Sequence, residues 1–432
     1  MTIINLKFMN SIISFWFAPA QLALLFMIGF HAHAQPIKVG GYGIETGEFV
    51  PQFDGKYFTM QRKDGIAIID LTGKMLTSGL KPPSTGIFRN LRIQLYKGVF
   101  FASNGNAIVL KNIAGQTLGT GIYSDVSPFV TGNTAVRAQG QPSTWIVAYV
   151  DTTGKEIVRF DVMKYLALAD PASKLKGTTL VTLNQFQPFS DGLTPIKSQV
   201  TGKYGYINRA MQLPIPVTFK SACTFSEGLA AVQNTDGLWG FIDTKGKLII
   251  PCHYTYSPGR FASGLAKVQN REGKYGYINK NDQVVITPRF AYATTFYKGY
   301  ALAKEGYTTQ PILIDSNGAV VTTFLKNTYY IDDSKPGTGI SGGDQLEDPF
   351  YISETLRELV DEGKGIFLLD MLKYGLVDNK GNVVLDFKYK YMSDLHGGKL
   401  LGYIDKTSTA PYQIGILDDK GDWLVLFVES EF

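Results

Sequence analysis

Short apolar runs, separated by turns rich in glycine and aspartate, follow one another along most of the chain. In Trp239–Asp243 side chains of alternating size indicate a strand with one buried face. Similar runs lie at Leu229–Gln233 and Lys247–Pro251, and an Asp-x-x-Gly turn precedes the second of these. A type I turn with a left-handed glycine fits that spacing. The pattern predicts short antiparallel strands, with Pro251 ending its strand because proline cannot donate a ladder hydrogen bond.

These strands recur in repeats of about 35–36 residues. A motif of the form Phe-x-x-Gly-Leu/Tyr starts at Phe189, Phe225, Phe261 and Phe296. An aromatic-Gly-aromatic-Ile motif starts at Tyr204, Trp239 and Tyr275, and apolar runs end at Pro251 and Pro288. The Asp-x-x-Gly turn and its variants also mark weaker copies of the repeat, so the chain contains nine candidate units in all. Their turns begin at Asp70, Asn112, Asp151, Asn208, Asp243, Asn279, Asp315, Asp378 and Asp418.

Two long steps between these turns predict insertions at 160–187 and 320–372. In the second insertion, Ser353–Glu362 reads as a short helix with Ser353 as its cap and Gly363 as its stop. Its apolar stripe is formed by Leu356, Leu359 and Val360. The first insertion carries a similar apolar segment before Pro171. We therefore expect two short helical insertions in an otherwise all-β chain.

The motifs resemble the WG repeat of bacterial proteins. The resemblance is strongest over 186–320 and returns near 373–390. It implies an all-β repeat protein, commonly exported or associated with the cell envelope, without shared catalytic residues and without a particular ligand. Gly240 lies between two bulky residues, so it predicts a close backbone approach. The structural repeat positions are Gly205, Trp239, Gly240, Gly276 and Gly375.

About nine units of 35–42 residues favour a propeller-like ring, because a radial arrangement protects strand edges. Trp423–Val428 is the strand that could pair with the first unit and close such a ring. An open β-solenoid stays as the alternative, since the units are short for four-stranded blades. In either architecture a single unit cannot bury its aromatic face, so neighbouring units must supply the core.

Residues 1–34 read as a secretory signal peptide. An apolar stretch from Ser11 to Phe30 ends before Ala32-His33-Ala34, which is a small-x-small cleavage pattern. An uncleaved anchor is the rival interpretation. Cleavage would leave a WG-type repeat domain at 35–432, without a second long apolar run. We expect an exported protein, periplasmic or extracellular, with no transmembrane span after cleavage.

Export leaves open whether Cys223 and Cys252 form a disulfide or are two small buried residues. Only His253 and His396 would remain after cleavage, so a zinc site is not expected. The net charge of +5 over 432 residues, without a basic run, makes nucleic acid a poor partner. The Gly-x-Gly-x-x-Gly at 337–342 lacks the flanking strand and helix of a dinucleotide site, so no cofactor is expected.

No residue set predicts catalysis directly. The leading interpretation is therefore an exported, non-catalytic repeat scaffold that binds an unidentified protein or envelope component. A secreted hydrolase using carboxylates of the 320–372 insertion is one alternative, and a purely structural envelope protein is another. Because recognition residues tend to lie on loops of a rigid scaffold, the second insertion supplies the candidates. They are Tyr329, Tyr330, Asp332, Asp333 and Asp344.

Overall fold

The structure is a computed structural model of the chain. It describes residues 37–40, 53–62, 64–82, 93, 95–105, 107–127, 129, 133–138, 146–171, 189–306, 309–330, 353–369, 373–393, 395–404 and 413–428. The chain divides into two units, Met1–Pro36 and Ile37–Phe432, and all described residues lie in the second. The predicted signal peptide lies outside them and stays a prediction. Within the described residues, no helix has both the length and the apolar character needed to cross a membrane.

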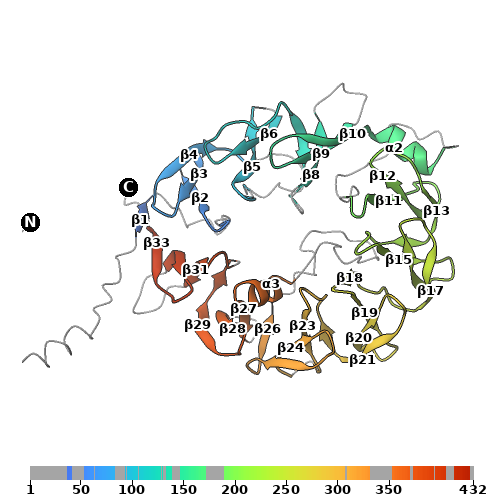
Figure 1. Cartoon of the computed structure of the whole chain (residues 1–432). Helices are drawn as coiled ribbons and strands as arrows, with labels where there is room; N and C mark the ends of the chain where they lie inside the picture. The colour runs from blue at the N-terminus through green and yellow to red at the C-terminus, as the bar shows by residue number, and fades with distance from the viewer. Residues whose placement is uncertain are drawn as a thin grey trace, which may run out of the picture. The chain divides into compact units, whose positions relative to one another are not determined.

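The described strands form eight sheets that stand as blades around a ring (Figure 1). The first blade is β2 (Tyr57–Arg62), β3 (Gly65–Asp70) and β4 (Met75–Leu80); the second is β5 (Val99–Asn104), β6 (Ala107–Asn112), β7 (Tyr123–Val126), β8 (Asn133–Ala138), β9 (Ile146–Asp151) and β10 (Glu156–Asp161). The third is β11 (Leu193–Lys197), β12 (Tyr204–Asn208) and β13 (Ile215–Phe219); the fourth is β14 (Ser221–Ala222), β15 (Leu229–Gln233), β16 (Trp239–Asp243) and β17 (Leu248–Tyr254).

The remaining four blades complete the ring. The fifth is β18 (Phe261–Ala262), β19 (Leu265–Gln269), β20 (Tyr275–Asn279) and β21 (Val284–Phe290); the sixth is β22 (Tyr292–Ala293), β23 (Tyr300–Lys304), β24 (Ile312–Asp315) and β25 (Val320–Thr323). The seventh is β26 (Thr328–Tyr330), β27 (Lys364–Leu369), β28 (Lys373–Asp378) and β29 (Val383–Tyr389); the eighth is β30 (Tyr391–Met392), β31 (Lys399–Ile404), β32 (Gln413–Asp418) and β33 (Trp423–Val428). This is a β-propeller, so the ring predicted from the repeats is confirmed and the open solenoid is wrong.

Nine repeats occupy eight blades because two of them share the second blade. Tyr123 of β7 pairs with Ile108 of β6, and this pair joins two repeats into one six-stranded sheet. The hydrophobic core still follows the repeats: the described residues form nine clusters, each lying between consecutive repeats. The nine expected units therefore form only eight blades, because this one residue pair merges two units into one sheet.

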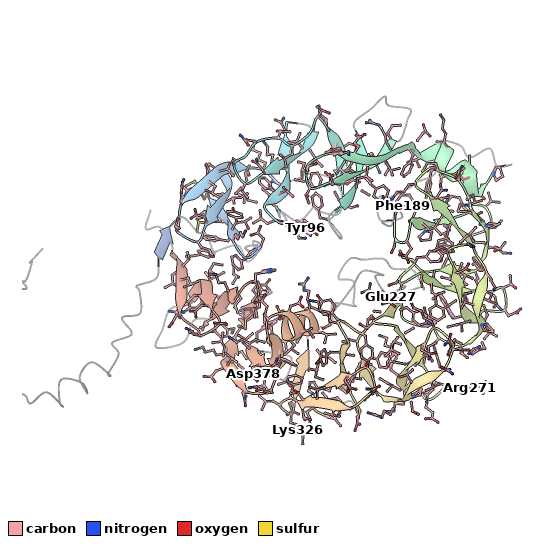
Figure 2. All side chains as sticks on the ribbon, viewed as in Figure 1. Tyr96, Phe189, Glu227, Arg271, Lys326 and Asp378 are labelled. Atoms are coloured by element: carbon pink, nitrogen blue, oxygen red, sulfur yellow. The ribbon has the colours of Figure 1, made fainter. Side chains whose placement is uncertain are left out.

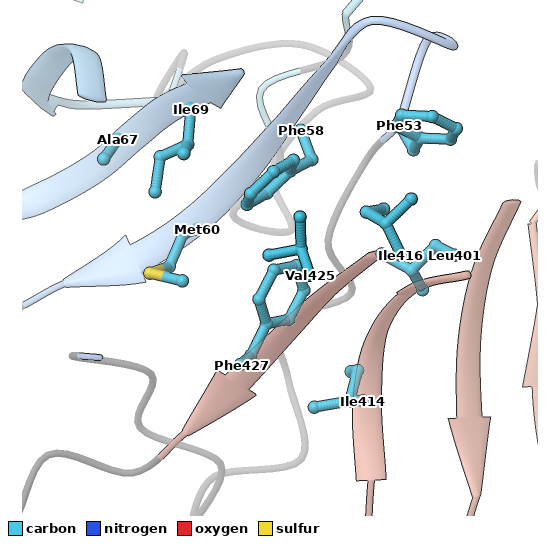
Figure 3. Packing of buried hydrophobic residues seen from close by; sticks show 10 residues of the cluster. All are labelled: Phe53, Phe58, Met60, Ala67, Ile69, Leu401, Ile414, Ile416, Val425 and Phe427. Carbon is cyan, nitrogen blue, oxygen red and sulfur yellow. The ribbon is translucent and has the colours of Figure 1, made fainter. Parts of the chain in front are cut away.

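The ring closes between its two ends. The strand β1 (Ile37–Gly40) pairs in parallel with β33 in the eighth blade. Trp423–Val428 was predicted to pair with the first unit, whereas its partner β1 precedes the first blade and belongs to the sheet of the last one. Phe58 and Met60 of the first blade pack against Val425 and Phe427 of the last (Figure 3). The Phe58 and Phe427 ring centroids lie 4.9 Å apart. Closure therefore combines a four-residue strand pairing with a shared core.

The repeated glycines lie where an outer strand bulges over its neighbour. Trp239 pairs with Tyr254 and Phe241 with Ile250, so β17 holds two extra residues opposite Gly240. A side chain on Gly240 would lie 2.5 Å from the Ile250 carbonyl oxygen. The predicted close backbone approach is confirmed. The prediction that Pro251 ends its strand is wrong: β17 continues to Tyr254, because the bulge removes the need for a proline N–H donor.

The same glycine contact recurs in other blades. A side chain on Gly205 would meet the Ile215 carbonyl oxygen at 2.6 Å, and one on Gly276 would meet the Ile286 carbonyl oxygen at 2.4 Å. At Gly375 the nearest atom belongs to the Phe387 ring. The aromatic residues next to these glycines are core residues: Tyr206, Phe241 and Tyr277 are fully buried.

Both expected helices are present. The helix α2 (Val162–Ala169) follows β10, and Asp161 caps it by accepting from the N–H groups of Met163 and Lys164. The helix α3 (Glu354–Asp361) begins after Ser353, whose Oγ accepts from the Leu356 N–H. The expected span of the second insertion needs correction. The strands β25, β26 and β27 all lie within 320–372, so the added segment starts after Tyr330 and ends with α3.

Candidate interaction surface

A tight two-residue turn joins the first two strands of most repeats. In the fourth blade, Glu227 and Gly228 both have positive φ, +53° and +83°. Ser226 and Leu229 exchange N–H···O bonds of 2.8 and 3.2 Å across them. Two left-handed residues in a two-residue loop define a type I′ turn, which matches the twist of its strands. The Phe-x-x-Gly motif is therefore a hairpin signal, and its third residue adopts a conformation that favours glycine.

At five positions the side chain before a glycine of positive φ accepts a hydrogen bond from the next repeat. Asp191 Oδ2 accepts from the Gly228 N–H at 2.8 Å, and Glu227 Oε2 accepts from the Gly264 N–H at 3.1 Å. We call this series of contacts the turn ladder. Its acceptor residues and their glycine donors are Asp54 with Gly98, Asp191 with Gly228, Glu227 with Gly264, Ser263 with Gly299, and Glu362 with Gly397 and Gly398.

The turn ladder lies on the side of the blades that faces the middle of the ring. Figure 2 shows Glu227 there, together with Tyr96 and Phe189 from corresponding segments of other repeats, whereas Arg271 and Lys326 lie at the outer side. Each acceptor bonds a glycine about one repeat further along the chain. The ladder therefore fixes consecutive turns relative to one another and makes their exposed side chains a rigid surface.

Helix α3 joins this surface in the seventh blade. Leu356 and Leu359 are buried against Leu313, Phe324 and Phe367, so the helix fills the space between the sixth and seventh blades. Buried Glu358 accepts from the backbone N–H groups of Ile366 and Leu395. The predicted helix is confirmed, and its apolar stripe serves packing.

A cluster of three polar side chains links the end of α3 to the sixth blade. The Tyr297 hydroxyl and the Lys298 ammonium each donate to a carboxylate oxygen of Asp361 at 2.8 Å. Burial raises the pKa of Asp361, but these two hydrogen bonds outweigh it and hold that pKa below its usual value. The hydrogen bond to Asp361 in turn raises the pKa of Lys298. Asp361 and Lys298 are therefore both charged at neutral pH. Tyr300 lies beside the cluster at the start of β23 with 37% of its surface exposed.

Two of the five predicted recognition residues lie in the part of the chain that the structure describes. Tyr329 and Tyr330 lie in β26, opposite Leu368 and Phe367 of β27. Asp332, Asp333 and Asp344 lie outside the described residues, as does the glycine-rich segment at 337–342. Within the described ranges, no three His, Cys, Asp or Glu side chains come together in a way that would hold a metal.

The two cysteines are free thiols on one blade. Cys223 follows β14 and Cys252 lies in β17, with β15 and β16 between these strands. Three strand spacings separate them by roughly 14 Å, which exceeds the reach of a disulfide. In the structure the two thiols are not joined, because the two positions lie at opposite edges of the same sheet.

The turn ladder was not predicted from the sequence. Its signal was present: an acceptor side chain stands immediately before the turn glycine at Asp54, Asp191, Glu227, Ser263 and Glu362. It was hidden because each hydrogen bond joins residues about one repeat apart, and no local pattern shows the pairing.

Sheet order, ring closure and the turn ladder define a β-propeller built from sequence repeats. The family described as WG containing repeat matches residues 204–239, 239–275, 275–308 and 374–401. The resemblance to WG repeats is therefore confirmed, and the chain carries WG repeats in these four segments.

Solved structures with similar backbones include a crystal structure of the eukaryotic initiation factor, at 10% identity and TM-score 0.48 over 87% of this chain and 98% of that chain. BamB from Moraxella catarrhalis is 12% identical with TM-score 0.31, covering 63% of this chain and 83% of that one. The WD40 beta propeller domain of Doa1 is 10% identical with TM-score 0.27, covering 71% and 86%. No curated protein matches the chain in sequence. The fold assignment therefore depends on the sheet order described above.

Proposed function

We propose that this chain is an exported, non-catalytic scaffold that binds a protein or another component of the cell envelope. The repeat propeller suggests an interaction scaffold, because it presents many turns on a rigid frame. Export is supported by the signal-like pattern at 1–34. Periplasmic and extracellular destinations both agree with that pattern.

One turn carries the proposed binding surface. The turns of the third, fourth and fifth blades end in Gly-Leu. The residue after the motif phenylalanine is small in all three: Ser190, Ser226 and Ala262. In the sixth blade the corresponding sequence is Tyr297-Lys298-Gly299-Tyr300. At the inner side of the ring two tyrosines thus replace small and aliphatic residues, and a lysine stands where the neighbouring turns have Asp191, Glu227 and Ser263. Tyrosine is enriched at protein interfaces because it offers a large, rigid contact area with a polar tip.

Affinity capture from native envelope extract tests this surface. The bait is the chain starting at Gln35, beside a Tyr300→Leu variant that restores the leucine found in neighbouring repeats. Tyr256→Leu is the matched control, since Tyr256 is also exposed but belongs to another segment. We expect a partner that the control retains and that Tyr300→Leu loses. Equal retention by all three baits would move recognition away from this turn, and the absence of any partner would overturn the scaffold proposal.

A further bait tests the recognition residues predicted at Asp332, Asp333 and Asp344. It replaces only 331–352 by a Gly/Ser linker of equal length. Replacement of a longer segment would remove β26 and α3, which belong to the blades. Loss of the partner from this bait alone would assign recognition to the added segment instead of the Tyr300 turn.

A further inference from the structure

The outer strand of each blade is a sheet edge, and one of these edges is already occupied. The strand β1 pairs in parallel with β33, from Ile37 opposite Val425 to Gly40 opposite Val428. Figure 1 shows β1 at the outer side of the last blade. An outer strand of this propeller can therefore accept a further strand of four residues.

Most other outer strands carry features that oppose such addition. The strands β13, β17 and β21 contain Pro216, Pro251 and Pro288, and each has a bulge in its middle. The strand β29 has a bulge at the corresponding place and carries Asp386 and Lys388. Prolines, bulges and charges all prevent edge-to-edge pairing.

The strand β25 lacks these features. Its sequence is Val320-Val321-Thr322-Thr323, without proline or charge. Its register shifts once, next to the turn, between Leu313 and Ile314 of β24. The strand β33 likewise shifts once next to its turn, between Ile416 and Leu417 of β32, and has no bulge in its middle. By register and composition, β25 resembles the one outer strand that accepts an added strand.

Exposed apolar side chains adjoin this edge. Val320 and Val321 are each 51% exposed, and Leu325 just beyond the strand is 39% exposed. Figure 2 shows the neighbouring Lys326 at the outer side of the ring. No described strand pairs with the outer side of β25. The turn of the seventh blade lies against its second half, where the Thr322 hydroxyl donates to the Asn379 carbonyl and Gly381 lies close to the Thr323 carbonyl. An unpaired strand edge beside exposed β-branched residues favours addition of a strand that is itself apolar at alternate positions, beginning at Val320 and Val321.

We propose that the outer edge of β25 binds an extended segment of a partner protein, which adds as a parallel strand in the way that β1 adds to β33. The segment pairs over about four residues, with β-branched side chains at alternate positions as in Ile37 and Val39. The inference rests on the proposed function in one respect, that the partner is a protein. The site is separate from the Tyr300 turn.

A peptide with the sequence of residues 35–42 tests the edge, because it carries the only strand seen to add to this propeller among the described residues. Amide hydrogen exchange of the chain starting at Gln35 is measured with and without excess peptide. We expect slower exchange over Val320–Thr323. No change of exchange there at millimolar peptide would overturn the proposal.

Two variants test whether the peptide binds at the edge of β25 and not at another outer strand. Val321→Lys places a charge on the edge and is expected to weaken peptide binding at least about tenfold, since edge charges oppose pairing. Val285→Lys is the matched control, because Val285 holds the equivalent position in β21, upstream of Pro288. Unchanged binding by Val321→Lys, or equal loss in both variants, would overturn the assignment.

Light scattering of the chain alone distinguishes a partner segment from a second copy of this chain at the β25 edge. A dimer that Val321→Lys dissociates would show that β25 pairs with another copy and that the partner segment is wrong. The peptide experiment does not use the native partner. If affinity capture finds no partner but the peptide still slows exchange at β25, the proposed function is wrong and the β25 edge remains a strand-addition site.

Discussion

Gly240 leaves no space for a side chain. A Cβ atom there would lie 2.5 Å from the Ile250 carbonyl oxygen and 2.8 Å from the Cys252 nitrogen. Both are backbone atoms, so the strand itself would have to move. We expect Gly240→Val to lower the free energy of unfolding by more than about 3 kcal/mol, measured by urea denaturation.

Gly264→Ala is the control for that prediction. It has nothing within 4 Å of the added methyl group but a φ of +77°. Only backbone strain opposes the substitution, at a cost of about 1–2 kcal/mol. If the two variants were equally stable, the packing explanation for the repeated Gly240 position would be wrong.

The free thiols give a second test of single residues. Unfolding in alkylating reagent without reductant should add two labels to the chain, one each at Cys223 and Cys252. In the folded chain Cys252 should react slowly, because burial raises the pKa of its thiol and lowers the thiolate fraction. A chain that accepts no label until reduced would show that the two sheet edges come together.

The Asp-x-x-Gly hairpins make the propeller sensitive to acid. In Asp70 the hydrogen bond from the Thr72 hydroxyl lowers the pKa, and in Asp378 the bonds from Asn382 and the turn backbone outweigh the effect of burial. A carboxyl group whose pKa is lower in the folded state stabilises fully above its unfolded pKa of about 3.9. That stability is lost as the pH falls through the folded pKa.

We therefore expect the urea midpoint to be steady from pH 7 to about 5 and to fall below about pH 4. Asp378→Asn should reduce the slope in the acid range, because one titrating turn is removed. An identical pH profile in wild type and variant would contradict the role of this turn.

Ring closure is a property of the whole chain, and it can be measured as a coupling. Phe58 and Phe427 belong to opposite ends of the chain and touch only when the ring is closed. Each phenylalanine-to-alanine change should cost about 3–5 kcal/mol by opening a cavity. The double variant should differ from the sum by about 0.5–3 kcal/mol, since contacting residues are coupled.

Phe58→Ala with Phe241→Ala provides the comparison. Phe241 is equally buried but lies in a different cluster, so the two effects should add within about 0.5 kcal/mol. Additivity in both pairs would argue against a closed ring in solution.

The repeats, the hairpin turns and helix α3 were predictable because each depends on neighbours within a few residues. Ser353 and Gly363 flank the helix that they predict. Features that join distant residues were not predictable. The merging of two repeats depends on the single pair of Ile108 and Tyr123, and the continuation of β17 past Pro251 depends on a bulge over Gly240.

In the candidate surface, too, the local features were predictable from the sequence and the contacts between distant residues were not. The departure of Tyr297-Lys298-Gly299-Tyr300 from the other turns is visible in the sequence alone. Its contact with Asp361 is not, because α3 reaches it across more than sixty residues. The turn ladder was hidden for the same physical reason.

The turn ladder also gives the array a polarity. Glu227 accepts from the repeat that follows it, while its own turn glycine donates to Asp191 of the repeat that precedes it. Each such unit therefore carries both halves of the junction, like a monomer with one head and one tail. A duplicated copy placed between two neighbours would find a complementary end on either side without any new substitution. Growth of the chain by tandem duplication is then limited by the geometry of a closed circle and not by the chemistry of its joints.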